Sequence, residues 1–489
     1  MRKIGSISYR FTLLMFSMAL ILSIVSCAGS NPQTKSPPTK FAASAPQYDL
    51  VFAVAGDSRV WDPKDLDAGD YWLNTSGHSS EDTAYYKQYI NTAALGALRD
   101  NLINSWKGSP GLFLMHVGDI GMRGGTPVFN AFKQEMDPLI TAGIPVYLTI
   151  GNHELRYYKR ENNGSKSGQA ESNANTYLAQ KEYQATIGKS MVPVGAEKFS
   201  PQYDGGLAYS FKRGNSLFIA LDSYYVNYDD TDNPKYKKGY YSDFQLDKLR
   251  EILKNISESV QNIFVFSHQP AFNADGGKGE FYNRYHPEDA NRSNWILWAL
   301  LDTYKVDAFF AGHSHFYHRW NVVGTKFGSK WDTDWRAVNS DFPDLKSFVN
   351  NYKGNNTKDN KTDWKNVIPQ VVNGSCGAPT QNFSGNSVPA AKRASVYNYS
   401  IVKVKGDTIT IEVYSYGYTQ TSKASNGKTV GTNVITQPTL IDQFQKQGGQ
   451  WQELSSPVQG VQVEDETGAM EDEAEAIEEE TAIVDETGA

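Results

Sequence analysis

The sequence predicts an α/β domain, and two observations support this prediction. Short apolar runs of five to seven residues, rich in Val, Ile and Phe, recur along the chain and end in polar or glycine-rich residues. Amphipathic stretches of helical length lie between several of these runs. Runs this short are typical of buried strands, and strands that alternate with helices indicate an α/β fold.

Six strands are expected in chain order. They cover residues 51–55, 112–117, 144–150, 217–221, 263–267 and 307–311. The amphipathic stretches predict helices over about residues 86–105, 129–142, 243–256 and 292–304. Two pairs of extended runs also predict β-hairpins, because each pair flanks a short segment with a central glycine. These turns are Arg213-Gly214-Asn215 and Lys405-Gly406-Asp407.

The sequence predicts one domain over residues 49–463, because no linker-like break divides this region. Long insertions are expected at about residues 60–85, 156–200 and 320–366, which contain many Tyr, Trp, Asn and Gly residues. Such segments often shape substrate sites, and solvated surface loops have a similar composition. Both interpretations remain open.

The N-terminus has the features of a bacterial lipoprotein signal. Three basic residues among the first ten precede an apolar run at residues 11–25, which is too short for a comfortable membrane span. The run ends in the tetrapeptide IVSC, which resembles a lipobox with Cys27 as the lipidated residue. The resemblance implies a signal peptide over residues 1–26 and a lipid anchor on Cys27. It places the protein at the membrane of the bacterial cell envelope, periplasmic or surface-exposed. The alternatives are an ordinary signal peptide or a single anchoring helix.

The net charge of −7 is unevenly distributed along the chain. Residues 464–489 hold twelve acidic residues and neither Lys nor Arg, which predicts a disordered, solvating tail. A weak cation-binding or partner-binding arm is the alternative. The tail contributes −12 and residues 1–26 contribute +3, so residues 27–463 carry +2. Within that range, residues 27–48 are rich in Pro, Ser, Ala and Thr and are expected to form a flexible linker.

Composition also excludes several classes of protein. The acidic balance argues against a nucleic-acid partner. Two cysteines in 489 residues exclude a disulfide framework and a cysteine-built zinc site. A polytopic membrane protein is excluded as well, because only one stretch is apolar enough to consider.

Five of the expected strands end in residues that can bind metal. The segments that follow them are Gly56-Asp57-Ser58-Arg59, Gly118-Asp119, Gly151-Asn152-His153-Glu154, His268 and Gly312-His313-Ser314-His315. In open α/β sheets, ligands bind at the carboxyl ends of the strands. Two Asp, one Asn and three His form a reasonable ligand set for first-row transition metals. Each signal is weak alone, but their ordered recurrence at strand ends predicts a metal site.

The order of these segments resembles the pattern of calcineurin-like metallophosphoesterases. In that family the pattern is Asp-x-His/Gly, Gly-Asp, Gly-Asn-His-Asp/Glu, His and Gly-His-x-His, and the resemblance covers about residues 49–320. It implies a four-layer α/β/β/α sandwich of two mixed sheets with long loop insertions. It also implies two divalent transition-metal ions (Fe, Zn or Mn) and hydrolysis of phosphate esters by a metal-activated hydroxide.

The resemblance implies roles for individual residues. The ligands of the first metal would be Asp57, Asp119 and His315. The ligands of the second would be Asp119, Asn152, His268 and His313, with Asp119 as the bridge. His153 would stabilise or protonate the leaving oxygen, and Glu154 either orients His153 or is a solvated carboxylate.

Two positions depart from the family pattern. Many relatives have His where this chain has Arg59, and purple acid phosphatases have Tyr where it has Met122. No purple ferric centre is therefore expected. The first metal is expected to have only three protein ligands, to be weakly held, or to take a further ligand from an insertion. Arg59 stays protonated and cannot bind a metal. It is predicted either to contact the substrate phosphate as a catalytic residue or to form a salt bridge, with Asp119 or Glu154 as the partner.

The remaining histidines and Cys376 contribute less to the predicted chemistry. His116 lies inside a predicted strand and is expected in the core. His78, His286 and His318 lie in predicted loops and are expected to be exposed, with the last two as further candidates for substrate contact. Cys376 is expected to be a buried small residue rather than a reactive thiol.

The sequence favours an envelope-anchored, metal-dependent phosphoesterase. A phosphomonoesterase is preferred, because the ending His315-Phe316-Tyr317-His318-Arg319 resembles that of purple acid phosphatases. A phosphodiesterase or nucleotide pyrophosphatase on the same site is the first alternative. The second is a non-catalytic surface binding lipoprotein with a degenerate metal site, in which Arg59 marks the loss of the first metal.

Overall fold

In the computed structural model, the described residues all lie within Pro46–Ala489. They are 48–60, 90–121, 124–155, 173–200, 205–226, 236–272, 287–324, 337–358, 361–378, 380, 390–416, 421–423, 429–431 and 437–454. The expected signal peptide with Cys27, the acidic tail, and the linker except for its last residue lie outside these ranges. Among the residues placed in the structure, no helix is both long and apolar enough to cross a membrane.

The first sheet has seven strands in the order β21-β20-β17-β16-β1-β2-β3. Three of them are parallel: β1 (Leu50–Ala55), β2 (Leu114–His116) and β3 (Val146–Leu148). The other four continue the sheet antiparallel to one another, with β16 also antiparallel to β1: β16 (Tyr397–Lys405), β17 (Thr408–Tyr416), β20 (Thr439–Gln447) and β21 (Gln450–Glu453).

The second sheet has eight strands in the order β15-β11-β14-β10-β9-β6-β5-β4. Its parallel centre consists of β6 (Ser216–Ala220), β9 (Asn262–Phe266), β10 (Ala308–Ala311) and β14 (Trp364–Asn373). Its antiparallel flanks are β4 (Glu197–Lys198) and β5 (Tyr209–Arg213) on one side, and β11 (Tyr317–Gly324) and β15 (Lys392–Ala394) on the other. Three two-stranded sheets pair β7 (Tyr224–Val226) with β8 (Tyr236–Lys238), β12 (Thr357–Lys358) with β13 (Lys361–Thr362), and β18 (Thr421–Lys423) with β19 (Thr429–Gly431).

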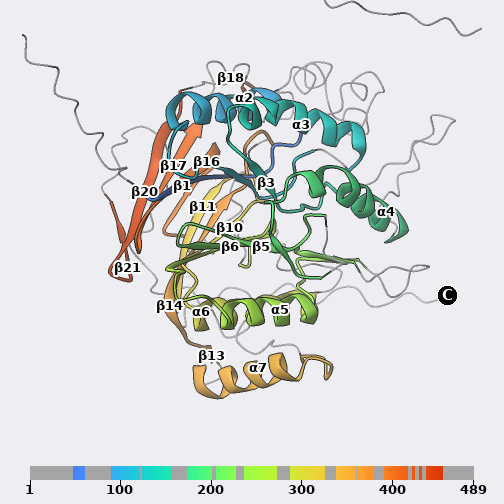
Figure 1. Cartoon of the computed structure of the whole chain (residues 1–489), viewed down its shortest axis with the longest axis vertical. Coiled ribbons are helices and arrows are strands. Elements are labelled where there is room, and N and C mark those ends of the chain that lie inside the picture. Colours follow the sequence, from blue (N-terminus) through green and yellow to red (C-terminus); the bar gives the residue numbers. More distant parts are fainter. Residues whose placement is uncertain are drawn as a thin grey trace, which may run out of the picture. The chain divides into compact units, whose positions relative to one another are not determined.

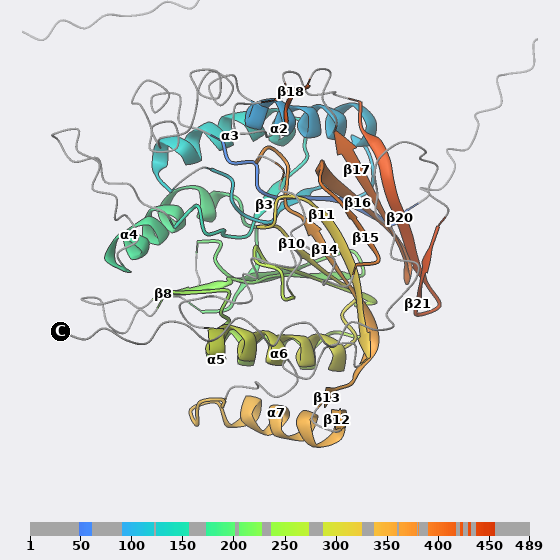
Figure 2. The same ribbon diagram turned by 180° about the vertical axis from the view of Figure 1, so that it is seen from behind.

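Helices cover the outer face of each sheet (Figures 1 and 2). On the first sheet these are α2 (Ile90–Asn101), extended by a π-helical turn at Leu102–Trp106, and α3 (Thr126–Thr141). On the second sheet they are α5 (Asp243–Lys254) and α6 (Pro287–Thr303), with α7 (Pro343–Asn356) packed against both. The helix α4 (Asn173–Tyr183) continues into a π-helical turn at Gln184–Gly188, which contacts α3.

Alternating side chains of β1 explain why two sheets stack. Phe52 and Val54 belong to the apolar cluster between the sheets, together with Phe218, Phe264 and Phe310 of the second sheet. Their neighbours Val51 and Ala53 belong to the cluster that includes the buried faces of the helices. Because strand side chains alternate between faces, a strand that is apolar at every position must be covered on both sides. The predicted four-layer α/β/β/α arrangement of two mixed sheets is confirmed.

The structure contains the six predicted strands, the four predicted helices and both hairpins. It differs in two of the three insertions, because parts of them are regular structure. The second holds α4, and the third holds α7 and the beginning of β14. Leu345 and Val349 of α7 are buried, so this segment packs on the outer side of the layer formed by α5 and α6 and is not a solvated loop. Most of the first insertion lies outside the described residues.

Candidate metal centre

The predicted site residues come together where parallel strands of both sheets end. Asp57 and Arg59 follow β1, Asp119 follows β2, and Asn152 and His153 follow β3. On the second sheet, His268 follows β9, while His313 and His315 follow β10. The first and second sheets therefore each contribute one half of the centre.

Two groups of side chains have the geometry to hold a cation. Asp57, Asp119 and His315 offer ligand atoms that lie within 4.8 Å of one another, and so do Asp119, His268 and His313. In the first group His315 Nε2 lies 3.5 Å from Asp57 Oδ1. In the second, His268 Nε2 lies 3.2 Å from Asp119 Oδ1 and 3.2 Å from His313 Nδ1. Asp119 belongs to both groups, as the predicted bridge requires.

Asn152 lies beside the second group, as the sequence predicts. Its Oδ1 is 3.2 Å from His268 Nε2 and also accepts a hydrogen bond from Tyr224 at 3.4 Å. His268 Nδ1 lies 2.7 Å from the carbonyl oxygen of Val117, so Nδ1 carries the proton. Nε2 then faces Asp119 and Asn152, so it is the ring nitrogen that would serve as the metal ligand once it gives up its own proton.

The charge distribution fits a cation. Asp57 and Asp119 are both fully buried. Burial, reinforced by the charge of Asp119, holds the pKa of Asp57 well above its ordinary value. Burial would also raise the pKa of Asp119, but His268 and His153 outweigh it and hold this pKa well below its ordinary value. Asp57 Oδ1 has no hydrogen-bond donor among the residues placed here. A buried carboxylate oxygen without a donor is costly, and a metal ion would compensate it.

The backbone of the centre is strained. Among the described residues other than glycine, five have a positive φ, and four of them are site residues: Asp57 (56°), Arg59 (48°), Asp119 (54°) and His313 (70°). This left-handed conformation costs roughly 1–2 kcal/mol for a residue with a Cβ. Such strain persists where the surrounding structure enforces it and clusters at functional sites.

Two glycines allow the strand ends to approach one another. A Cβ on Gly312 would lie 2.4 Å from Asp57 Oδ2, and a Cβ on Gly151 would lie 2.4 Å from Asp119 Oδ1. Neither carboxylate could keep its position if these residues had side chains. The two glycines therefore let the backbone pass close to the carboxylates, because they have no side chain that would displace them.

Arg59 and Glu154 both contact the segment that carries Asp119. Arg59 Nη2 lies 3.1 Å from Asp119 Oδ2, so the predicted salt bridge is present with Asp119 as the partner. Glu154 is fully buried rather than solvated, and its carboxylate accepts from the backbone N–H groups of Asp119 (2.9 Å), Gly151 (2.7 Å) and Gly121 (3.3 Å). Burial raises the pKa of Glu154 to about 7. Glu154 thus connects the loops after β2 and β3.

His153 lies beside the bridge residue. Its backbone N–H donates to Asp119 Oδ1 at 2.9 Å, and its ring Nε2 lies 3.8 Å from Asp119 Oδ2. Its exposed fraction is 2%. The ring is therefore held next to the atoms that both candidate groups share.

Other sequence expectations have mixed outcomes. His116 is a core residue as predicted, with its ring against Phe132, and burial lowers its pKa to about 3. Cys376 is also buried as predicted, and burial raises its pKa. The expectation that His318 is exposed is wrong, because it lies on β11, which is paired on both sides by β14 and β15. His78, Met122 and His286 lie outside the described residues.

Tyr317 and Arg319, which shaped the preference for monoesters, make hydrogen bonds away from the strand ends that carry the candidate groups. Both side chains contact Asp442 of the first sheet. Tyr224 was not among the predicted site residues, although its ring centroid lies 5.9 Å from that of His268 and 6.5 Å from that of His313. Tyr224 begins the short strand β7, and only three residues separate it from the buried strand β6. So short a strand has no periodic pattern of side chains from which its position could have been predicted.

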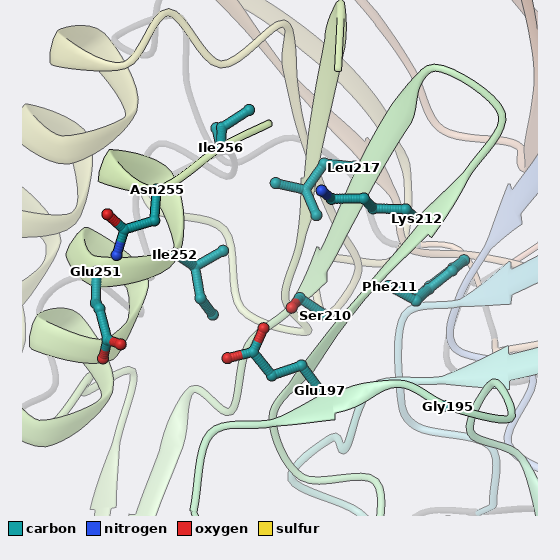
Figure 3. Close-up of a pocket in the computed structure, with 10 residues that line it drawn as sticks. All are labelled: Gly195, Glu197, Ser210, Phe211, Lys212, Leu217, Glu251, Ile252, Asn255 and Ile256. Carbon is teal, nitrogen blue, oxygen red and sulfur yellow. The ribbon is translucent and has the colours of Figure 1, made fainter. Parts of the chain in front are cut away.

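A separate hollow of about 460 Å³ lies between the C-terminal end of α5 and the hairpin of β5 and β6 (Figure 3). Its lining includes Phe211 and Lys212 from β5, Leu217 from β6, and Ile252 from α5. None of the predicted site residues lines it.

Comparisons with known proteins identify relatives of part of the α/β region. The family model described as calcineurin-like phosphoesterase matches residues 67–317. Purple acid phosphatase 23 of Arabidopsis thaliana is 26% identical over 199 residues, which are 40% of this chain and 34% of that protein. This alignment therefore spans about a third of the Arabidopsis relative.

Two solved structures show the extent of structural similarity. The purple acid phosphatase PPD1 from yellow lupin (Lupinus luteus) seeds has 16% sequence identity and a TM-score of 0.45. The match covers 80% of this chain and 54% of that one. A structure of PhoD has 13% identity and a TM-score of 0.45, with coverage of 86% and 74%.

Proposed function

Because the chain belongs to the calcineurin-like phosphoesterase family, we propose that it is a metal-dependent phosphoric ester hydrolase. The observation that carries the proposal is the pair of candidate metal groups that share Asp119. A single shared carboxylate between two such groups is what a dinuclear centre requires, because its two oxygens can serve two ions.

We assign the first ion to Asp57, Asp119 and His315, and the second to Asp119, Asn152, His268 and His313. The donor set of carboxylate, amide and imidazole suits Fe, Zn or Mn. When bound, two such ions supply Lewis-acid activation of water and of the phosphoryl group. The protein holds the ligands in place through the strained turns and through the Val117 carbonyl that fixes His268.

His153 is proposed to hold the proton that the leaving oxygen receives. Its position beside Asp119 supports this role, since a general acid must be close to the reacting atoms. Arg59 is proposed to bind the substrate phosphate while it pairs with Asp119. A guanidinium carries five N–H donors, so it can hold one carboxylate oxygen and still donate to a phosphoryl oxygen.

Phosphomonoesters are the proposed substrates, and phosphodiesters or nucleotide pyrophosphates are the alternative. The support comes from the Arabidopsis relative that is named a purple acid phosphatase. Tyr317 and Arg319 lend none, because they contact Asp442. We also propose, from the sequence alone, that Cys27 anchors the protein to the bacterial cell envelope.

The test combines metal analysis with turnover. Bound metal is measured in the purified protein, and nitrophenyl phosphate and bis(nitrophenyl) phosphate are assayed with added Mn²⁺, Zn²⁺ or Fe²⁺. His153→Ala should retain its metal and lose about 10²–10⁴-fold in turnover, as expected for a general acid. His318→Ala, which removes a buried histidine outside the centre, is the control.

Two results would contradict the proposal. Equal turnover in His153→Ala and the parent would remove His153 from the mechanism. A protein that binds no metal and hydrolyses no phosphate ester would instead be the surface binding lipoprotein with a degenerate site.

A further inference from the structure

A buried ionic network connects the two sheets next to the proposed centre. Arg319 of β11 donates from Nε to Asp442 Oδ2 of β20 at 2.8 Å, and both side chains are 1% exposed. The hydroxyl of Tyr317, two residues earlier on β11, donates to the same oxygen. Arg319 Nη2 also lies 2.7 Å from Glu453 of β21, and its guanidinium carbon lies 4.2 Å from the ring centroid of Phe444.

We propose that Tyr317, Arg319 and Asp442 are positioning residues for His313 and His315, an inference that rests on the proposed metal-dependent function. His315 precedes Tyr317 by two residues, so the network holds the strand that begins immediately after the two histidines. The residues do not touch the candidate groups themselves, and they act through the segment 312–316 that joins β10 to β11.

The strain at His313 explains why this segment needs a fixed downstream end. With a φ of 70°, His313 would relax unless both ends of the segment were held. The upstream end is held by β10, which is paired with β9 and β14 in the middle of the sheet. The downstream end is β11, which lies near the edge of the sheet and is tied to the other sheet through Asp442.

The polar chemistry of the network favours positioning over simple stability. Apolar residues of similar volume often stabilise a core as well as a buried ion pair does. Directional bonds do something that apolar contacts do not, because they fix the position of β11 relative to β20 of the other sheet. Within its own sheet, β11 is held in register by β14 and β15. Asp442 adds a connection between the sheets, because one of its oxygens accepts from both Tyr317 and Arg319.

The chain offers a matched control on the same strand. Lys446 of β20 pairs with Asp307, a buried residue that immediately precedes β10. This pair also joins the two sheets, but at the end of β10 opposite to His313. Lys446→Ala leaves the buried Asp307 carboxylate with the Ile263 N–H but without its cation. Asp442→Ala likewise leaves a buried guanidinium with one partner fewer, so both variants should lose stability.

The experiment titrates the full-length protein and both variants with Mn²⁺ or Zn²⁺ by calorimetry and measures their Tm values. Asp442→Ala should bind metal about tenfold more weakly, as outer-shell changes do at metal sites. Lys446→Ala should bind with the affinity of the parent although its Tm also falls. Tyr317→Phe removes one hydroxyl and should weaken binding about threefold to tenfold, which keeps the test valid if Asp442→Ala does not fold.

The results separate this inference from the function on which it rests. Equal metal affinities in the parent and Tyr317→Phe or Asp442→Ala would overturn the positioning role while leaving the proposed function intact. If Lys446→Ala lost as much metal affinity as Asp442→Ala, the network would stabilise the fold without positioning the two histidines. A parent protein that binds no metal would overturn both.

Discussion

Asp119 presents its two carboxylate oxygens to different neighbours. Oδ1 lies 2.9 Å from the backbone nitrogen of His153 and 3.2 Å from His268 Nε2. Oδ2 lies 3.1 Å from Arg59 Nη2 and 3.8 Å from the His153 ring. This single side chain therefore touches residues from three other strand ends, and its loss should affect both candidate metal groups at once.

Replacing Asp119 should remove both metal ions, whereas replacing Asp57 should remove one. Asp119→Asn takes a charged ligand from each group, so metal content should fall from about two ions per chain to nearly none. Asp57→Asn changes only the first group and should leave about one ion. Elemental analysis of the purified variants measures this. A protein that keeps one ion after Asp119→Asn would show that Asp119 is not the bridge.

Arg59→His should change metal binding and substrate binding in opposite directions. Removing a cation 3.1 Å from Asp119 and adding an imidazole should tighten binding of the first metal. Losing the proposed phosphate contact should raise KM roughly tenfold or more, since hydrogen bonds to charged groups contribute about 1.5–3 kcal/mol. Metal titration and steady-state kinetics test both effects. Higher metal content with an unchanged KM would show that Arg59 forms the salt bridge to Asp119 and does not contact the substrate.

Asp222 should make stability depend on pH. It is buried, and burial raises its pKa to about 8, far above the ordinary 3.8. Between pH 4 and 8 the folded state therefore keeps a proton that the unfolded chain has lost, and this contribution to stability falls as pH rises. Asp222→Asn keeps an oxygen that can accept from the Tyr224 N–H. It should raise the free energy of unfolding by about 2–4 kcal/mol at pH 8 and change it little near pH 4.

Denaturant unfolding across this pH range measures the effect of Asp222→Asn. Asp302→Asn is the control, because Asp302 accepts from Tyr352 and from the backbone N–H groups of Lys365 and Asn366. That substitution should only destabilise the protein. A gain from Asp222→Asn that is the same at pH 4 and pH 8 would show that ionisation is not its cause.

At the scale of single elements, strands with unbroken apolar runs could be predicted and irregular ones could not. The run in β9 is buried at all five positions. In contrast, β14 contains Pro369, and its first half is partly exposed. The helices α4 and α7 are rich in Asn, a weak helix former, so their sequences resemble loops. In α7 the helix forms because Leu345 and Val349 are buried against the outer helix layer, a tertiary effect that local sequence does not contain.

The side chain of Phe52 on β1 lies at the centre of the aromatic core between the two sheets. Phe52 has ring centroids of Phe113, Phe218, Phe264, Phe266 and Phe310 within 6.3 Å. Phe52→Ala should cost about 3–5 kcal/mol, because it removes a fully buried ring and leaves a cavity that two sheets cannot close. Phe348→Ala on the partly buried face of α7 should cost clearly less. Chemical denaturation of both variants tests this, and similar losses would contradict the assigned centre of the core.

At the scale of the whole molecule, the meeting point of the candidate ligands could be predicted because the carboxyl ends of parallel strands share an edge. This rule located Asp57, Asp119 and His268 without any distance information. It could not locate the contacts that cross between elements without sequence periodicity. Glu154 connects two loops, Tyr224 approaches the histidines, and Arg319 reaches across to the other sheet. Each of these three contacts depends on how separate elements pack together, so the local sequence around the residue does not predict it.

Charge is also a property of the whole chain, and it is separable from the folded domain. Deleting residues 464–489 should move the net charge from −7 to +5, because this segment holds twelve acidic residues and no basic ones. If the segment only solvates the protein, Tm, metal content and KM should not change. Ion-exchange elution should shift strongly towards cation exchangers. A lower KM for an anionic substrate after deletion would instead indicate that the tail reaches the centre.

The left-handed turns at the strand ends lower the stability of the fold, and the proposed catalytic centre depends on the residues that form them. Glycine would relieve roughly 1–2 kcal/mol of strain at each of Asp57, Arg59, Asp119 and His313. A variant library sorted for heat resistance alone should therefore enrich glycine at Asp57 and His313, and the survivors should be robust and inactive. Arg59 and Asp119 should be kept, because losing either residue breaks their ion pair. The same library sorted for turnover should reject glycine at Asp57 and His313. The positions at which the two selections disagree would then outline the centre without any knowledge of its chemistry.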